Sequence, residues 1–472
     1  METERLSSTG KDKIKCSIAV YGCAKNQVDA EEMAERLTAA GYEVTGDVHD
    51  ADVLIVHTCG FIEDAKRESI EGIFHALEAS ERPGGRIPVI VTGCLSQRYP
   101  DELLKEIPEI SGVAGTAAPR DIVRIVGEVL ERRISPQAVE KDGPSQAREG
   151  RIRYVGEPGR GAPGGGLYRF GRYLTKPWAY LRVAEGCRHL CTYCAIPSIR
   201  GPLRSRPEDE ILAEAGHLVS LGVKELNLIA QDLSDYGFDL IGKRCLARLL
   251  TKLSAVPGVK WIRLLYVRPD GVDEELAEAM TLPNVVPYID LPIEHGSPKI
   301  LRLMGRPGPE KILRAVELLR DAVPDLYLRT TIITGFPGET EKDVLETMEL
   351  LSAIRAHRVG VFPFSREEGT PAYDLPGEVP ETEARERAEA IRRHGLRLAS
   401  ERGAEMVGKE VEVLLERPSM RPGYWIGRGP HQAPEVDGVT YVKTSAGCKG
   451  SVLRTRVTNS GILTLFGKET SV

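Results

Sequence analysis

At 472 residues the chain is too long for one hydrophobic core, and typical domain sizes predict roughly two to four domains. Apolar residues make up 41% of the sequence and charged residues 28%, which excludes a disordered or fibrous chain. The net charge of −6, from 63 basic and 69 acidic residues, excludes a polycationic nucleic-acid-binding protein but leaves room for a local basic patch.

No segment of the sequence points to a membrane or to secretion. Met1–Arg5 lack the apolar core of a signal peptide, and no apolar stretch is long enough to span a bilayer. We therefore expect a cytoplasmic protein that does not contact a membrane. Nine cysteines in such a chain favour metal-ligand or redox chemistry over a disulfide framework.

Residues 14–135 alternate short apolar runs with amphipathic stretches, which is typical of an open α/β domain with a parallel sheet. Buried strands are expected at Ile14–Tyr21, Val53–His57 and Ile87–Thr92. Helices are expected over Ala30–Ala40 and Ala65–Ala79.

One cysteine follows each of these three strands: Cys23, Cys59 and Cys94. In an open α/β sheet these positions share the carboxyl edge, where ligands bind, so the three thiols can converge. A glycine beside each cysteine lets the backbone approach a bulky ligand. The residues alone leave two interpretations open, a cluster or metal site and three buried core thiols.

Residues 136–173 lose this periodicity and are rich in glycine, proline and arginine, which predicts a flexible linker. Its arginines could touch an acidic partner, although a solvated connector is favoured; they are Arg151, Arg153, Arg160, Arg169 and Arg172.

Residues 174–403 alternate six strand candidates with helical stretches, which predicts an incomplete (βα)6 barrel. The strands are expected at Tyr180–Ala184, Glu225–Ala230, Trp261–Tyr266, Val286–Leu291, Leu328–Ile333 and Val359–Phe364. The helices are expected at Glu208–Leu221, Asp273–Thr281, Pro309–Val323 and Lys342–Ile354. In parallel α/β barrels the chemistry lies at the carboxyl ends of the strands.

Three cysteines spaced CxxxCxxC follow the first of these strands: Cys187, Cys191 and Cys194. One loop can turn three thiolates toward one point and supply three of the four ligands of a four-iron cluster, leaving one iron open to a cofactor or substrate. The alternatives are three unrelated thiols and a zinc site that could include His189. Zinc usually takes four protein ligands in pairs, and no second CxxC or HxxxH follows, so the spacing favours the cluster.

Further polar groups fall at the predicted strand ends and are candidates to line a pocket: Gln231, Asp232, Tyr266, Glu294, His295 and Gly335. His295 could carry a proton, although packing or a hydrogen bond is the commoner role of one histidine. Glu339 is expected near the positive N-terminus of the following helix.

Residues 405–470, after a helical stretch that ends near Arg402, break into short β-like runs and predict a small β-barrel. The runs are Glu410–Leu415, Tyr424–Gly427, Thr440–Val442 and Gly461–Leu465. The three remaining cysteines are expected to be ordinary thiols, in a strand, a helix and the barrel respectively: Cys16, Cys245 and Cys448.

The CxxxCxxC loop resembles the signature of the radical S-adenosylmethionine (SAM) superfamily, which implies that the open iron binds SAM and that Tyr193 lies beside its adenine. The segments around the three N-terminal cysteines, Gly22–Asp29, Thr58–Ile62 and Val91–Arg98, are similar to the N-terminal domain of the methylthiotransferases. This resemblance implies two four-iron four-sulfur clusters, with Cys23, Cys59 and Cys94 holding the auxiliary one. It also implies a SAM pocket that includes Tyr193, Gln231 and Gly335.

The branch that the chain resembles within this family is the RimO type, which modifies a ribosomal protein. The segments that carry the resemblance are Ala195–Gly201, Leu228–Asp232, Pro292–Pro298 and Phe364–Thr370. The MiaB type, which modifies tRNA, typically has asparagine at the position of Asp232. Glu294 and Gly296 depart from the pattern, because the family usually has glutamine and alanine there. Residues 405–470 resemble a TRAM domain, in which Glu435 and Asp437 could pair with a basic ribosomal protein.

The implied reaction adds a methylthio group to the β-carbon of an aspartate in ribosomal small-subunit protein twelve, free or within the small subunit. No catalytic residue beyond the clusters is implied, and electrons would come from a donor such as flavodoxin or ferredoxin. Two alternatives remain: a tRNA-adenosine methylthiotransferase, and a non-catalytic iron–sulfur protein that binds RNA.

Overall fold

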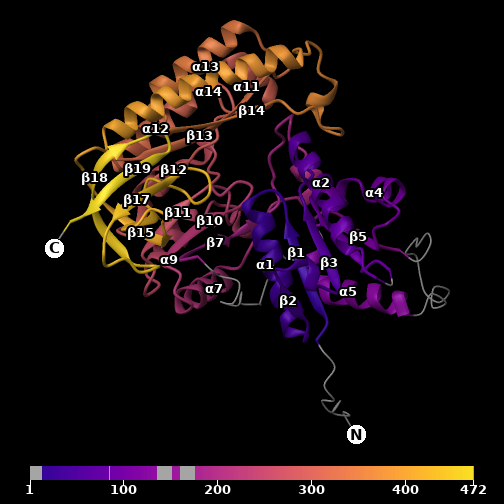
Figure 1. Cartoon of the computed structure of the whole chain (residues 1–472). Coiled ribbons are helices and arrows are strands. Elements are labelled where there is room, and N and C mark those ends of the chain that lie inside the picture. The colour runs from indigo at the N-terminus through magenta and orange to yellow at the C-terminus, as the bar shows by residue number, and fades with distance from the viewer. Residues whose placement is uncertain (1–12, 84, 135–150, 160–175, 471–472) are drawn as a thin grey trace. The chain divides into compact units, whose positions relative to one another are not determined.

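The computed structural model describes residues 13–83, 85–134, 151–159 and 176–470, drawn from indigo to yellow in Figure 1. The chain forms two compact units. The first comprises residues 1–167 with Ser198–Arg200, and the second comprises residues 168–197 with 201–472. No helix within the described residues is both long and apolar enough to cross a membrane.

The first unit is built on a parallel sheet of six strands in the order β2-β1-β3-β4-β5-β6. The strands are β1 (Lys15–Val20), β2 (Glu43–Thr45), β3 (Val53–Thr58), β4 (Val89–Gly93), β5 (Gly112–Ala114) and β6 (Ile152–Tyr154). The helices are α1 (Ala24–Ala39), α2 (Glu63–Ser80), α3 (Cys94–Arg98), α4 (Pro100–Glu106) and α5 (Ala118–Ile134). The strand order reverses between β1 and β3, which is where open α/β sheets bind ligands.

Apolar side chains cover both faces of this sheet. Ile55 of β3 packs in one cluster with Met33 of α1 and Ile122 of α5. The neighbouring Val56 belongs to a second cluster with Ile73 of α2. Adjacent residues of a strand point to opposite faces, so a continuous apolar run is buried on both sides. The predicted open α/β fold is confirmed.

Two elements of the first unit differ from the sequence prediction. Helix α1 begins at Ala24, six residues before the predicted start at Ala30, because its first turns bury polar side chains such as Asn26 and Asp29, which hide the apolar period. Strand β6 lies inside the stretch predicted as a linker, where Ile152 pairs with Gly112 of β5. Of the linker arginines, Arg160, Arg169 and Arg172 lie outside the described residues.

The second unit contains the predicted incomplete barrel, a parallel sheet of six strands in the order β14-β13-β12-β11-β10-β7. The strands are β7 (Trp178–Arg182), β10 (Glu225–Ile229), β11 (Trp261–Leu264), β12 (Val285–Asp290), β13 (Tyr327–Thr334) and β14 (Arg358–Pro363). The larger helices are α7 (Glu208–Ser220), α9 (Leu246–Ser254), α10 (Glu274–Ala279), α12 (Pro309–Ala322), α13 (Glu341–Ala353) and α14 (Glu381–Ala404).

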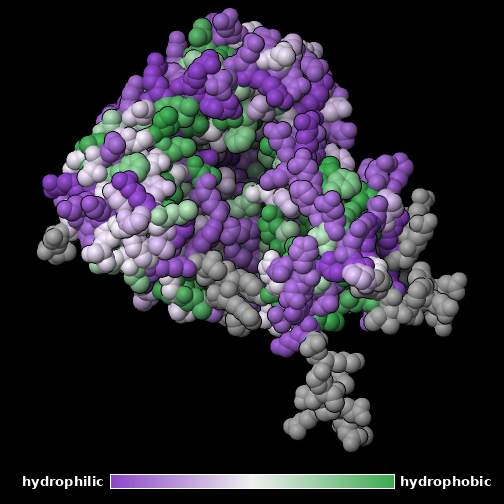
Figure 2. All heavy atoms as spheres, viewed as in Figure 1, coloured by the Kyte–Doolittle hydropathy of each residue, from purple (hydrophilic) through white to green (hydrophobic). Residues whose placement is uncertain are grey.

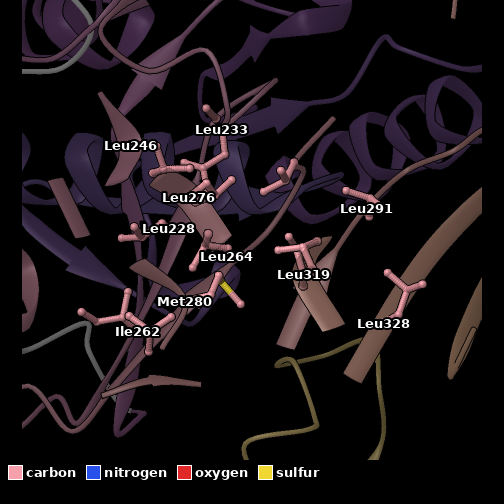
Figure 3. Packing of buried hydrophobic residues seen from close by; sticks show 14 of the residues in the cluster. Leu228, Leu233, Leu246, Ile262, Leu264, Leu276, Met280, Leu291, Leu319 and Leu328 are labelled. Carbon is pink, nitrogen blue, oxygen red and sulfur yellow. The ribbon is translucent and has the colours of Figure 1, made fainter. Parts of the chain in front are cut away.

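Leucine-rich packing joins these helices to the sheet. Figure 3 shows Leu228 of β10 and Leu264 of β11 near Leu276 of α10, with Leu319 of α12 in the same buried cluster. The outer side of α14 is rich in charged residues, and Figure 2 shows hydrophilic side chains over the helices at the top of that view. The amphipathic periods that predict helices in this segment therefore correspond to real buried and exposed faces.

The chain ends in a closed five-stranded barrel in the order β15-β16-β17-β19-β18. The strands are β15 (Glu410–Pro418), β16 (Tyr424–Arg428), β17 (Val439–Lys443), β18 (Val452–Ser460) and β19 (Thr464–Glu469). The barrel is confirmed, but the sequence prediction missed β18. That strand alternates exposed Arg454 and Arg456 with buried Thr455 and Val457, so it offers no apolar run.

Buried charges join this barrel to the six-stranded sheet within the second unit. Glu225, at the start of β10, accepts hydrogen bonds from Arg263 of β11 and Arg428 of β16. Asp437, in the loop after β16, is fully buried and accepts a hydrogen bond from Tyr288 of β12. The barrel therefore contacts the sheet through buried ion pairs and hydrogen bonds.

The two carboxylates expected to meet a basic ribosomal protein have partners inside the chain. Asp437 also accepts a hydrogen bond from the Ala433 amide, and it is inaccessible to a partner. Glu435 pairs with Lys176 at 2.6 Å and accepts a hydrogen bond from Tyr180. The prediction for Asp437 is wrong, because sequence alone did not reveal that its loop docks on the sheet.

Candidate cluster-binding sites

The three N-terminal cysteines follow neighbouring strands of the first unit. Cys23 lies between β1 and α1, Cys59 follows β3, and Cys94 opens α3 directly after β4. Burial, with smaller contributions from nearby Cys94 and Cys23, raises the pKa of the Cys59 thiol to about 12. Such mutual effects require short separations, so the sheet brings the three thiols together at its carboxyl edge as the sequence predicts.

Glycines keep the space around these thiols open. Gly22 has a φ of +102°, and a Cβ there would lie 2.6 Å from the Cβ of Cys59. A Cβ on Gly60 would lie 2.7 Å from the Cα of Leu95. Gly93 also has a φ of +102°, and its Cβ would lie 2.5 Å from the carbonyl oxygen of Thr58. Any side chain at these positions would push the cysteine-bearing turns apart.

A network of polar side chains that the sequence prediction missed surrounds the same turns. Arg200 ends the short helix α6 (Ile196–Arg200), and the segment Ser198–Arg200 belongs to the first unit. Its Nε donates to the Sγ of Cys94 at 3.3 Å. Arg200 also donates to Asp29 and to Asn26, both at 2.9 Å. No local sequence pattern indicates this contact, because Arg200 lies 106 positions from Cys94 in the sequence.

The second group of cysteines lies in the loop after β7 and the short strand β8 (Ala184–Glu185). Gly186 has a φ of +76°, and a Cβ there would lie 2.0 Å from the carbonyl oxygen of Pro202. The Cys187 amide donates to the Gly201 carbonyl at 3.1 Å, and the Thr192 amide donates to the Met304 carbonyl at 3.1 Å. Backbone contacts thus hold both ends of the loop at the carboxyl side of β7.

Side chains fix the middle of this loop. His189 Nε2 lies 2.7 Å from Asp232 and 2.8 Å from Asp235. Burial lowers the pKa of His189, but its hydrogen bonds to the two aspartates outweigh this effect and raise the pKa to about 9. The imidazole is thus a cationic anchor of the loop, which removes it from the ligands proposed for a zinc site.

His189, Asp232 and Asp235 are close enough to hold a metal ion, since their ligand atoms lie within 4.8 Å of one another. Two arginines already supply positive charge there. Arg188 pairs with Asp235 at 2.6 Å, and Arg244 pairs with it at 3.1 Å. We therefore interpret this cluster as support for the cysteine loop.

The geometry of both cysteine triads argues against a single zinc ion. In the described part of the chain, no other three His, Cys, Asp or Glu ligand atoms lie within 4.8 Å of one another. A tetrahedral zinc ion, with Zn–S bonds of about 2.3 Å, would hold its sulfurs about 3.8 Å apart. In neither triad do all three sulfurs lie within 4.8 Å of one another.

The cysteine thiols are also better suited to serve as metal ligands than as catalytic nucleophiles. Burial raises the pKa of Cys187 to about 11 and that of Cys194 to about 12. Burial raises the pKa of Cys94 as well, against the effect of Arg200. At neutral pH such thiols stay protonated unless a bound cation stabilises the thiolate, as iron does.

Arginines contact the second triad too. Arg268 donates from Nη1 to the Sγ of Cys191 at 3.2 Å, while its Nε and Nη2 bond to Asp270. Arg306 is buried and also hydrogen-bonds Cys191. The sequence prediction missed both arginines, although Arg268 follows the β11 strand end by four residues.

The residues predicted to line the SAM pocket each have different neighbours in the structure. Tyr193 is half-buried and hydrogen-bonds Glu294, whose pKa burial raises despite the nearby Arg306. Glu294 has a φ of +70°, an unusual conformation for a residue with a side chain. Gln231 donates to Glu185 at 3.1 Å. A Cβ on Gly335 would lie 2.4 Å from that of Ala384, so packing against α14 already accounts for this glycine.

The remaining strand-end candidates have structural partners. His295 is fully buried, contacts Glu339 at 3.1 Å and accepts a hydrogen bond from the Ser297 amide. This closed network favours the structural role over a proton carrier. Tyr266 has a φ of +62° and donates its amide to Asp290 at 3.3 Å. Cys16 is buried in β1, whereas Cys245 precedes α9 and does not lie within a helix as predicted.

Family models match three segments of the chain. Residues 15–115 match the "Uncharacterized protein family UPF0004", residues 181–351 match the "Radical SAM superfamily", and residues 407–469 match the "TRAM domain". Enzymes of the radical SAM superfamily use SAM and an iron–sulfur cluster as cofactors. The segment 181–351 contains Cys187, Cys191 and Cys194.

Solved structures share this fold at low sequence identity. The radical SAM methyltransferase TsrM from Kitasatospora setae, with cobalamin and a [4Fe-4S] cluster bound, is 15% identical, with a TM-score of 0.55 over 93% of this chain and 83% of that one. The same enzyme with tryptophan and a SAM analogue has a TM-score of 0.53 at 15% identity, over 74% of this chain and 73% of that one.

Full-length relatives are much more similar in sequence, and each bears the name "Ribosomal protein uS12 methylthiotransferase RimO". The Synechococcus sp. (strain JA-2-3B'a(2-13)) protein is 42% identical over 98% of this chain and 93% of its own length. The Geobacter sulfurreducens protein is 40% identical over 98% and 99%, and the Moorella thermoacetica protein is 41% identical over 94% and 96%. The chain belongs to the RimO family and is a radical SAM methylthiotransferase.

Proposed function

We propose that this enzyme adds a methylthio group to the β-carbon of an aspartate in ribosomal protein uS12, small-subunit protein twelve, in the cytoplasm. The observation that carries the proposal is the presence of two separate cysteine triads, each at the carboxyl end of parallel strands, in a chain about 40% identical to the uS12-modifying enzymes. The N-terminal triad distinguishes this chemistry from a radical reaction that needs one cluster.

We assign a four-iron four-sulfur cluster to each triad, one to Cys187, Cys191 and Cys194 and an auxiliary one to Cys23, Cys59 and Cys94. The raised thiol pKa values and the glycines beside the cysteines support both assignments. When bound, the clusters and SAM supply the radical and sulfur chemistry that replaces an unactivated C–H bond, which polar side chains cannot achieve.

The chain's own residues would bind and orient SAM at the carboxyl end of the incomplete barrel. Tyr193 presents its ring directly before the third cysteine, and the Gln231 amide and the Gly335 turn follow two other strands. Glu294, which hydrogen-bonds Tyr193, adds a carboxyl group beside these residues. We place the SAM pocket among these four residues.

We propose that each segment of the chain has its own role. Residues 14–135, together with β6, hold the auxiliary cluster, and the rest of 136–173 connects this part to the next. Residues 174–403 form the radical SAM core, and residues 405–470 recruit the substrate. Electrons would come from a small donor such as flavodoxin or ferredoxin, because a radical SAM cluster would need one electron for each SAM molecule that it cleaves.

The test compares two substrates. The full chain, reconstituted anaerobically with iron and sulfide, is incubated with SAM, reductant and either small ribosomal subunits or tRNA, and both polymers are analysed by mass spectrometry. We expect methylthio groups on uS12 only, and none with the Cys191→Ala variant. A methylthio mark confined to tRNA adenosine would refute the uS12 assignment. Absence of SAM cleavage by the fully loaded protein would favour a non-catalytic iron–sulfur protein.

A further inference from the structure

Arg200 contacts both a cysteine of the N-terminal triad and the polar groups behind it. Its side chain is 3% exposed. Each part of the guanidinium has a separate partner: Nε donates to the Sγ of Cys94, Nη1 to Asp29 and Nη2 to Asn26. The planar fork therefore holds the Nε–H aimed at sulfur.

The partners of Arg200 are themselves fixed to the cysteine-bearing turns. Asn26 donates from Nδ2 to the carbonyl of Tyr21 at 2.7 Å and to that of Thr58 at 3.1 Å. These carbonyls lie two residues before Cys23 and one residue before Cys59. Asp29 lies 3.4 Å from His57 of β3. Arg200 thus belongs to a rigid polar network that reaches the turns of all three cysteines.

We infer that Arg200 is a positioning residue that sets the reduction potential of the auxiliary cluster, an inference that rests on the cluster assignment proposed above. One-electron reduction adds a negative charge to the cluster and its thiolates. A buried cation that donates an N–H to a ligand sulfur stabilises this more negative state, and so raises the potential. The contact is well placed for this effect, because burial prevents water from screening it.

A purely structural role for Arg200 is the competing interpretation. Its charge is balanced by Asp29, and loss of either partner would leave a buried charge unpaired. Such a role would affect folding and cluster retention, but would leave the potential of a retained cluster unchanged. The potential therefore separates the two interpretations.

The experiment uses the full chain with Cys187, Cys191 and Cys194 replaced by alanine, so that iron can load only on the N-terminal triad. Three further variants are made in this background: Arg200→Gln, Arg200→Lys, and the charge-balanced pair Asp29→Asn with Arg200→Gln. Iron and sulfide are counted, the melting temperature is recorded, and the midpoint potential is measured by dithionite titration followed by EPR.

We expect each variant that retains iron to have a lower midpoint potential than the background protein. The fall should be largest for Arg200→Gln and smaller for Arg200→Lys, which keeps the charge but lacks the fork. Arg206→Gln, which removes another buried arginine that bonds Glu214, should leave the potential unchanged.

An unchanged potential in both Arg200→Gln and the charge-balanced pair would overturn the inference. Loss of iron from the charge-balanced pair at an unchanged melting temperature would also overturn it, since Arg200 would then retain the cluster without tuning it. If the background protein itself binds no iron while the full cysteine set does, the auxiliary cluster assignment fails instead. These outcomes keep the two claims distinguishable.

Discussion

Glu225 of β10 and Arg428 of β16 form a completely buried ion pair 2.5 Å long, and it ties the C-terminal barrel to the six-stranded sheet. Arg263 shares the same carboxylate at 2.8 Å. Burial opposes the charge on Glu225, but the two arginines outweigh it and lower the pKa of the carboxyl. The pair therefore depends on all three charges being present.

Replacement of Glu225 by glutamine should destabilise the second unit strongly. It would leave the buried Arg263 without the carboxylate with which it pairs and would leave Arg428 with Glu416 alone. Breaking a buried pair in this way costs about 3–5 kcal/mol. Urea unfolding of the wild-type and variant chains measures the change. Glu412→Gln, which breaks the half-exposed pair with Lys260, is the matched control and should cost less than about 1 kcal/mol. Equal effects would contradict the importance of the buried network.

Cys59→Ala should remove the auxiliary cluster without unfolding the chain. Anaerobic reconstitution should then give about four irons per chain instead of about eight, because each cluster holds four. Cys16→Ala is the control, since Cys16 is buried in the same unit but lies within β1, away from the strand end. Retention of the full iron content by Cys59→Ala would contradict the assignment of this triad.

Gly22→Ala should impair cluster loading more than Gly41→Ala. Both glycines have positive φ, +102° and +93°, so both variants strain the backbone by about 1–2 kcal/mol. Only at Gly22 would the new Cβ meet a cysteine, 2.6 Å from the Cβ of Cys59, while nothing lies within 4 Å at Gly41. Iron content and melting temperature of the two variants separate strain from the clash. Equal iron content would show that the turn tolerates the extra carbon.

Acid should destabilise the second unit through two buried histidines. Burial and neighbouring arginines hold the pKa of His357 and of His431 at about 3. The unfolded chain would bind these protons below about pH 6.5, so stability should fall as the pH drops from about 6.5 to about 3, by about 1.4 kcal/mol per pH unit for each group.

His357→Asn tests this pH dependence. His357 accepts a hydrogen bond at Nδ1 from the Leu328 amide, and the asparagine oxygen can replace that acceptor. Unfolding free energies at several pH values should show a slope reduced by about one proton in the variant. His217→Asn, in the half-buried part of α7, serves as the control for a general effect of losing a histidine. An unchanged slope in His357→Asn would contradict the account.

Strand and helix patterns in the sequence predicted all three folded parts, because apolar runs such as Val53–His57 correspond to strands that are buried on both faces. The same patterns missed the start of α1 and the strand β18, where polar residues interrupt the apolar period. The first turns of α1 bury Asn26 and Asp29, and β18 exposes Arg454 and Arg456, so neither displays a regular apolar period.

The cysteines of the candidate sites could be predicted because local signals mark them, namely the CxxxCxxC spacing and the position after a strand. Their arginine partners could not. Arg200 reaches Cys94 across 106 positions, and Arg268 reaches Cys191 across 77, so only the folded chain reveals these contacts. The docking of the Asp437 loop on Tyr288 was hidden for the same reason.

Tandem mass spectrometry of uS12 after reaction with the reconstituted chain tests the central claim most directly. We predict a single methylthio group on the β-carbon of one aspartate, formed by the wild-type chain and by Cys16→Ala, and absent with Cys59→Ala and Cys191→Ala. Unmodified uS12 from a reaction in which the loaded wild-type chain cleaves SAM and marks tRNA would contradict it.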